Sequence, residues 1–235
     1  RAVHSSPQKW AAIASDRAGL EREIRRLIER GLFYLRYTTG DPARNMWEKG
    51  VRIVTDYVEK YVGELRNLNF EPEKEFETLI EYEDEKGGAL ISGAIDIVRQ
   101  DNPPRVTLID FKSGDPESDL HQKLDDEQIR LQVALYAVAA KKELEYQPEQ
   151  GLVRYLDAHD PSRAELCVPL GEKALRETRQ HVMETACRIR DREFDAGPTA
   201  APRDPSKKVR CAECDFSEFC GRYRTKPDGK ARGSR

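Results

Sequence analysis

Apolar residues recur at helical spacing in the first third of the chain. Between residues 16 and 37, leucines and isoleucines recur every three or four residues, and Asp16 is placed to cap such a helix. From Val51 to Leu65 a second apolar set keeps the same spacing with charges between its members. These patterns predict two amphipathic helices ahead of the remaining elements.

The pattern then changes to the short segments typical of strands. Residues 74–84, 87–100 and 105–114 are rich in apolar and β-branched positions, and turn-like "EKGG" and "DNPP" separate them. This arrangement predicts a β-meander of three strands.

Helix and strand patterns alternate in the next part of the chain. Residues 125–145 predict a helix, 150–158 and 163–170 predict two strands, and 171–193 predict a long helix. A meander followed by a crossover helix and further strands favours an α/β fold with a mixed central sheet.

Composition narrows the classes of protein. The 235 residues are 38% hydrophobic and 35% charged, and no apolar run approaches the roughly 20 residues of a membrane-spanning helix. We therefore expect a soluble protein without a membrane partner. The first residues, "RAVHSSPQKW", lack an initiating Met and a signal-peptide core, which favours a piece of a longer chain. The net charge of −3 does not itself indicate nucleic-acid binding.

Two aspartates and a lysine stand among apolar strand residues. Asp96 and Asp110 fall on neighbouring predicted strands, and Lys112 leaves the same strand face as Asp110. Buried carboxylates require a partner, and two of them suit a hard cation such as Mg²⁺ or Mn²⁺. A lysine beside them can orient or deprotonate water and offset charge on a phosphate. The alternative is an Asp–Lys ion pair with a turn-capping aspartate.

These segments resemble those of a known family. "GAIDIV" followed by "LIDFKSG" is similar to the G-x-x-D and D-x-K motifs of the PD-(D/E)XK nucleases of the RecB-like branch. In "QVALYAVAA", Gln132 and Tyr136 match that branch's Q-x-x-x-Y helix motif, and their spacing places them on one helix face. The resemblance implies a restriction-endonuclease-like mixed sheet flanked by helices, and metal-dependent hydrolysis of DNA.

The resemblance also implies roles for single residues. Asp96 and Asp110 would hold Mg²⁺ or Mn²⁺, helped by the backbone carbonyl of Phe111. Lys112 would position the nucleophile, and Gln132 and Tyr136 would support the site or contact DNA.

The resemblance concerns two further metal-ligand positions, an acid and a histidine. A further acid often precedes the first strand motif, and "EPEKEFE" offers Glu73, Glu75 or Glu77, of which Glu73 and Glu75 are preferred. RecB-like members commonly carry a metal-binding histidine in a helix before the strands, but "KGVRIVTDYVEKY" contains none, and His4 lies far upstream. We expect water in that position, weaker metal binding or impaired catalysis.

Three of the five cysteines crowd together near the C-terminus. Cys211, Cys214 and Cys220 have the spacing C-x2-C-x5-C, which suits a soft metal and favours a reducing, intracellular compartment. The spacing resembles that of iron–sulfur nucleases of the RecB-like branch, including AddB-type and CRISPR-adaptation nucleases, over residues 48–223. The fourth ligand is unidentified, because Cys167 and Cys187 follow the nuclease motifs. A [4Fe–4S] cluster, zinc or another metal, and unliganded thiols all stay open.

The resemblance suggests an organisation and three functions. We expect a helical lead-in at 1–66, a nuclease core at 67–197, a cysteine-cluster clasp at 198–223 and a disordered tail at 224–235. The preferred function is the deoxyribonuclease domain of a UvrD/RecB-type helicase–nuclease in DNA repair, an exonuclease rather than an endonuclease, with DNA and helicase motor domains as partners. The alternatives are a stand-alone RecB-like exonuclease and a catalytically silent DNA-binding module of the same fold.

Overall fold

The computed structural model describes residues 1–31, 41–81, 87–116 and 126–193. Residues 1–183 form one compact unit, and only residues 184–193 of the second unit are described. The predicted cysteine cluster, its connector and the tail lie outside the described residues.

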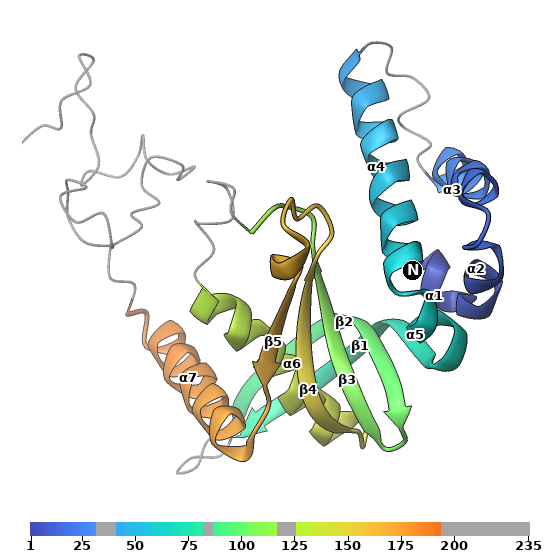
Figure 1. Ribbon diagram of the computed structural model, residues 1–235. Coiled ribbons are helices and arrows are strands. Elements are labelled where there is room, and N and C mark those ends of the chain that lie inside the picture. Colours follow the sequence, from blue (N-terminus) through green and yellow to red (C-terminus); the bar gives the residue numbers. More distant parts are fainter. Residues whose placement is uncertain (32–40, 82–86, 117–125, 194–235) are drawn as a thin grey trace, which may run out of the picture. The chain divides into compact units, whose positions relative to one another are not determined.

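A mixed sheet forms the centre of the first unit (Figure 1). Its strands follow chain order: β1 (Asn69–Glu81), β2 (Gly88–Asn102), β3 (Arg105–Lys112), β4 (Gln147–Tyr155) and β5 (Glu165–Pro169). Neighbouring strands are antiparallel except β3 and β4, which run parallel and are joined through helix α6 (Asp126–Glu143). The predicted meander, crossover helix and α/β class are confirmed.

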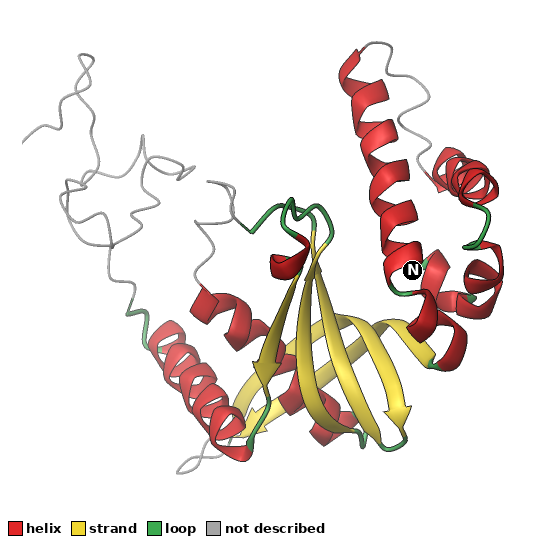
Figure 2. Ribbon diagram, in the orientation of Figure 1, coloured by secondary structure: helices red, strands yellow, loops and turns green. Residues whose placement is uncertain are grey.

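Helix α6 covers one face of the sheet (Figure 2). Val133, Ala137 and Val138 of this helix are buried with Val98 and Leu108 of the strands. The long C-terminal helix α7 (Glu172–Arg190) contributes Leu175 to the same core. The predicted helices at 125–145 and 171–193 are thus confirmed, beginning one residue later and ending two or three residues earlier than predicted.

Five N-terminal helices form a second core. They are α1 (Ala2–Ser5), α2 (Pro7–Ile13), α3 (Arg17–Gly31), α4 (Asp41–Lys60) and α5 (Val62–Asn67). The two predicted amphipathic helices correspond to α3 and to α4 with α5, and the Asp16 carboxylate accepts a hydrogen bond from the backbone N–H of Gly19 at 3.0 Å. Trp10, Leu20, Ile24, Val58 and Leu65 form the centre of this core, against which Phe70 and Phe111 of the sheet pack.

Candidate active site

The side-chain alternation of β1 and β2 is interrupted at Asp96. Ile95 and Val98 share the core beneath α6, although residues three apart in a regular strand face opposite sides. The β1–β2 pairing leaves out the pair Glu73 and Asp96, and Glu73 has a φ of 51°. Positive φ is uncommon for a residue with a side chain. Such irregularities often occur beside active sites, where they redirect a side chain.

The Asp96 carboxylate joins β2 to β3 beyond the end of their ladder. The regular pairing of these strands ends at Ile97 and Ile109. Two residues further along β3, the backbone N–H of Phe111 donates to Asp96 Oδ2 at 2.8 Å. A side chain therefore replaces a ladder bond and fixes Asp96 next to the D-x-K segment.

Asp110 is a buried carboxylate paired with Lys112. Its exposed fraction is 2%. The Lys112 ammonium lies 2.8 Å from Asp110 Oδ2 and forms an ion pair with it. Burial raises the pKa of Asp110, and the Asp96 carboxylate raises it further, which together outweigh the opposing effect of Lys112. The charged form of Asp110 would therefore be stabilised by a further cation.

Lys112, Gln132 and Tyr136 form a hydrogen-bonded chain with a defined direction. Lys112 Nζ donates to Gln132 Oε1 at 2.9 Å, and Gln132 Nε2 donates to the Tyr136 hydroxyl at 2.7 Å. An ammonium only donates, so the amide oxygen must face Lys112 and the amide nitrogen must face Tyr136. Burial raises the pKa of Tyr136, as do the charges of Asp110 and Asp96. The neutral Tyr136 hydroxyl thus retains its own proton for donation.

Comparisons with known proteins identify the family of this chain. The family model of the PD-(D/E)XK nuclease superfamily matches residues 1–221. The chain belongs to the PD-(D/E)XK nuclease superfamily. Comparison with curated proteins gave no match. A solved structure titled "Crystal structure of SSO0001" is similar at 18% identity and a TM-score of 0.44, covering 86% of this chain and 82% of that one.

PD-(D/E)XK nucleases generally use Mg²⁺ or Mn²⁺ and act on nucleic-acid phosphodiesters. In the described part of the chain, no group of three or more His, Cys, Asp or Glu side chains could hold a metal ion. Two carboxylates nevertheless fit Mg²⁺, which usually keeps several waters and binds through one or two carboxylates plus substrate oxygens. The buried Asp110 carboxylate, whose pKa is raised by burial and by the nearby Asp96 carboxylate, fits the same ion. Asp96, Asp110 and the carbonyl of Phe111 would be its protein ligands.

The three candidate glutamates before the first strand motif, Glu73, Glu75 and Glu77, are all exposed. Glu73 is exposed and forms an ion pair with Arg1 at 2.8 Å. Glu75 is exposed and pairs through its backbone with Ala94. Since Phe76 faces the core beneath α6, Glu75 and Glu77 leave the opposite side of β1.

His4 is distant in sequence but lies directly behind the D-x-K segment. Its ring packs against Phe70 and Phe111, with centroids 5.1 and 5.8 Å apart. Phe111 and Asp110 leave opposite faces of β3, so His4 is behind the carboxylates rather than among them. Burial, the chain's amino terminus and Arg154 lower the pKa of His4 to about 3. The ring is therefore neutral at ordinary pH.

Two of the five cysteines lie in the described part of the chain. Cys211, Cys214 and Cys220 lie outside the described residues. Cys167 on β5 is exposed, and Cys187 on α7 is half-buried. Among the described helices, none has the length and apolar character to cross a membrane.

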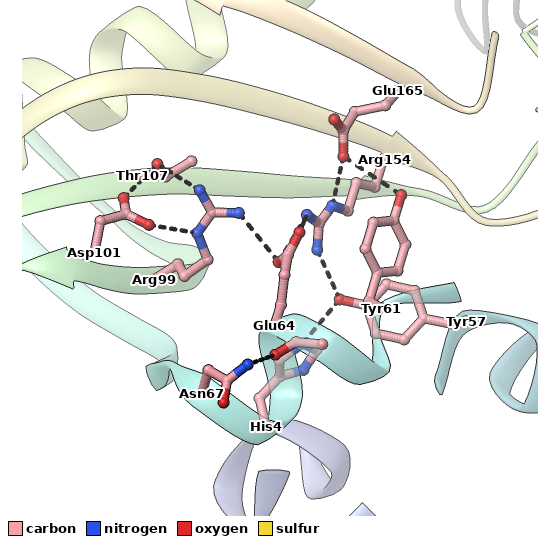
Figure 3. A network of polar contacts seen from close by, with 11 residues as sticks. His4, Tyr57, Tyr61, Glu64, Asn67, Arg99, Asp101, Thr107, Arg154 and Glu165 are labelled. Carbon is pink, nitrogen blue, oxygen red and sulfur yellow. Dashed lines mark hydrogen bonds and ion pairs between the residues drawn. The ribbon is translucent and has the colours of Figure 1, made fainter. Parts of the chain in front are cut away.

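A buried arginine behind the site was missed by the sequence reasoning. Arg154 on β4 has an exposed fraction of 1% and is the centre of the polar network in Figure 3. The signal was present in "GLVRYL", where a charged residue interrupts an apolar strand. That same signal drew attention to Asp110.

Proposed function

We propose that this chain is a RecB-like deoxyribonuclease domain whose site is built from Asp96, Asp110, Lys112, Gln132 and Tyr136. The observation that carries the proposal is the continuous set of contacts from Asp110 through Lys112 and Gln132 to Tyr136. A lysine paired only for stability would not need a glutamine and a tyrosine aligned behind it.

The polar groups suit phosphodiester hydrolysis. The Lys112 ammonium lies between Asp110 and Gln132. There it can orient an attacking water and offset the negative charge that develops on the phosphate. Tyr136 offers its proton to a phosphate oxygen, since its own oxygen already accepts from Gln132. A bound Mg²⁺ or Mn²⁺ would supply further neutralisation of phosphate charge.

The finer part of the proposal concerns biological context. We propose an exonuclease that belongs to a helicase–nuclease of DNA repair, with helicase motor domains as partners and the domain boundaries expected above. The motif resemblance to the RecB-like branch supports this assignment. A stand-alone exonuclease would have the same site. The cysteine cluster, with [4Fe–4S] or zinc bound, would be an additional element of either protein.

A catalytically silent DNA-binding module is the second candidate. Two observations favour it: His4 lies behind the carboxylates, and the described residues provide no three-residue ligand group. Calorimetric titration with Mn²⁺ separates the candidates. A nuclease should show a site that Asp96→Asn and Asp110→Asn both remove, and a silent module should show none.

The direct test of the exonuclease compares two DNA substrates of one sequence. Linear single-stranded DNA should be degraded in Mg²⁺ or Mn²⁺, a covalently closed circle should be spared, and a chelator should stop the reaction. Equal loss of the circle would contradict an exonuclease but keep the nuclease. No loss of either substrate would contradict the proposed function.

A further inference from the structure

The buried guanidinium of Arg154 has a hydrogen-bond partner at each of its three nitrogens. Glu64 of α5 accepts from Nη2 at 2.7 and 3.0 Å, and Glu165 of β5 accepts from Nε at 2.9 Å. The Tyr57 hydroxyl accepts from Nη1 at 3.1 Å, and the Tyr61 ring lies 3.7 Å from the guanidinium carbon. An isolated buried charge costs roughly several kcal/mol, and these partners offset that cost.

This network joins the N-terminal helices to four strands of the sheet. Glu64 also pairs with Arg99 of β2 at 3.1 Å, and Arg99 in turn contacts Asp101 and Thr107. Figure 3 shows the helix residues and the strand residues meeting around Arg154. The position of α4 and α5 is therefore fixed with respect to β2, β4 and β5.

The network reaches the D-x-K segment through Tyr57. Arg154 only donates, so the Tyr57 oxygen accepts from it, and the same hydroxyl is hydrogen-bonded to His4 Nε2 at 2.9 Å. The Tyr57 ring meets Phe111 edge to face at a centroid distance of 5.5 Å, and His4 meets it at 5.8 Å. In the parallel β3–β4 pair, Phe111 is the register partner of Arg154.

Both sides of Phe111 are thus held. Its backbone N–H donates to the Asp96 carboxylate. Its side chain contacts the rings of Tyr57 and His4 on the face of the sheet opposite to Asp110. We propose that Tyr57, oriented by Arg154 and His4, is a positioning residue that sets the backbone of Phe111 and Asp110 for metal binding. This inference rests on the proposed metal site.

The test variant is Tyr57→Phe, which keeps the ring and removes only the hydroxyl that joins Arg154 to His4. Its matched control is Thr78→Val, which removes another buried hydroxyl, one bound to Glu143 at 2.9 Å. Calorimetric titration with Mn²⁺ and thermal unfolding in chelator are measured for wild type and both variants. Loss of an outer partner of a metal ligand weakens metal binding by about 10- to 100-fold.

We expect the Mn²⁺ Kd of Tyr57→Phe to rise about tenfold, while Thr78→Val keeps the wild-type Kd even if its Tm falls. Phe111→Leu should weaken Mn²⁺ binding in the same way, and the double variant with Tyr57→Phe should be no weaker than the weaker single variant. A lower Tm with unchanged Kd in Tyr57→Phe would overturn this inference and leave the proposed metal site intact. Absence of Asp110-dependent Mn²⁺ binding in the wild type would overturn both this inference and the proposed metal site.

Discussion

Asp110 and Arg154 are buried charges on neighbouring strands, one residue out of register and on opposite faces of the sheet. Arg154 pairs in register with Phe111, and Asp110 pairs with Val153. The guanidinium has two carboxylates, a hydroxyl and a ring as partners, whereas the Asp110 carboxylate has the Lys112 ammonium as its partner and a second carboxylate, Asp96, near enough to raise its pKa. The Arg154 network serves the fold, and the pair of carboxylates is where we propose that a cation binds.

This contrast predicts that removing the charge of Arg154 destabilises the fold more than removing the charge of Asp110. In chelator, Arg154→Met should lower the free energy of unfolding by about 3 kcal/mol, because Glu64 and Glu165 lose a buried partner. Asp110→Asn should change it by less than about 1 kcal/mol, because a carboxylate with a raised pKa is replaced by a neutral amide. Denaturant unfolding measures both values, and equal losses would contradict the contrast.

The directed chain from Lys112 to Tyr136 predicts a graded effect on rate. Gln132→Leu should lower the cleavage rate by about 100-fold, because Lys112 loses the acceptor that orients it. Tyr136→Phe leaves that acceptor in place, so its loss should be smaller. Single-turnover kinetics at saturating Mn²⁺ separate the two. A larger loss in Tyr136→Phe would place the main role on the tyrosine.

Gly151 marks a close contact between β4 and α6. A Cβ at this position would lie 2.3 Å from Val133 Cγ1 and 3.3 Å from Val168 Cβ. We expect Gly151→Ala to cost about 1–3 kcal/mol of stability, and the double variant with Val133→Ala to lose less than the sum of the single losses. Gly171→Ala is the control, because nothing lies within 4 Å of its Cβ position. Additive losses in the double variant would exclude this clash as the cause.

Asp157 predicts a pH-dependent contribution to stability. Burial opposes its ionisation, but Lys49 at 2.5 Å and Arg52 at 2.6 Å outweigh this and hold the pKa of Asp157 below its usual range. Its stabilisation is therefore present above the unfolded pKa of about 3.9 and is lost as pH falls through the lower folded pKa. At pH 7, Asp157→Asn should lose about 1 kcal/mol.

The difference between wild type and Asp157→Asn should shrink below about pH 4. Glu149→Gln is the control, since Glu149 and Arg105 are 57% and 58% exposed and such pairs contribute little. A difference that persists at low pH would show that Asp157 acts through packing rather than charge.

The sequence predicted the elements that have a strong period. Helix α6 and strands β2 and β3 follow from apolar periodicity and turn residues, and the grouping of Gln132 with Tyr136 follows from their four-residue spacing. Helices α1 and α2, with four and seven residues, are too short to show a period. They were not predicted.

Other features depend on contacts that no local pattern records. The break at Asp96 depends on the φ of 51° at Glu73 in a different strand. His4 and Phe111 lie 107 positions apart, and only the packing of α1 against the sheet brings them together. Arg154 could have been noticed as a charge in an apolar strand, but its partners come from α4, α5 and β5.

The most direct test of the proposed site is cleavage of linear single-stranded DNA by purified wild type, Asp110→Asn and Lys112→Ala in Mn²⁺. We expect the wild type to cleave only with the metal, and each variant to lose about a thousandfold in rate. Circular dichroism of the variants should match the wild type, since neither change removes core packing. Wild-type rates of cleavage in both folded variants would contradict the assignment of Asp110 and Lys112 to the active site.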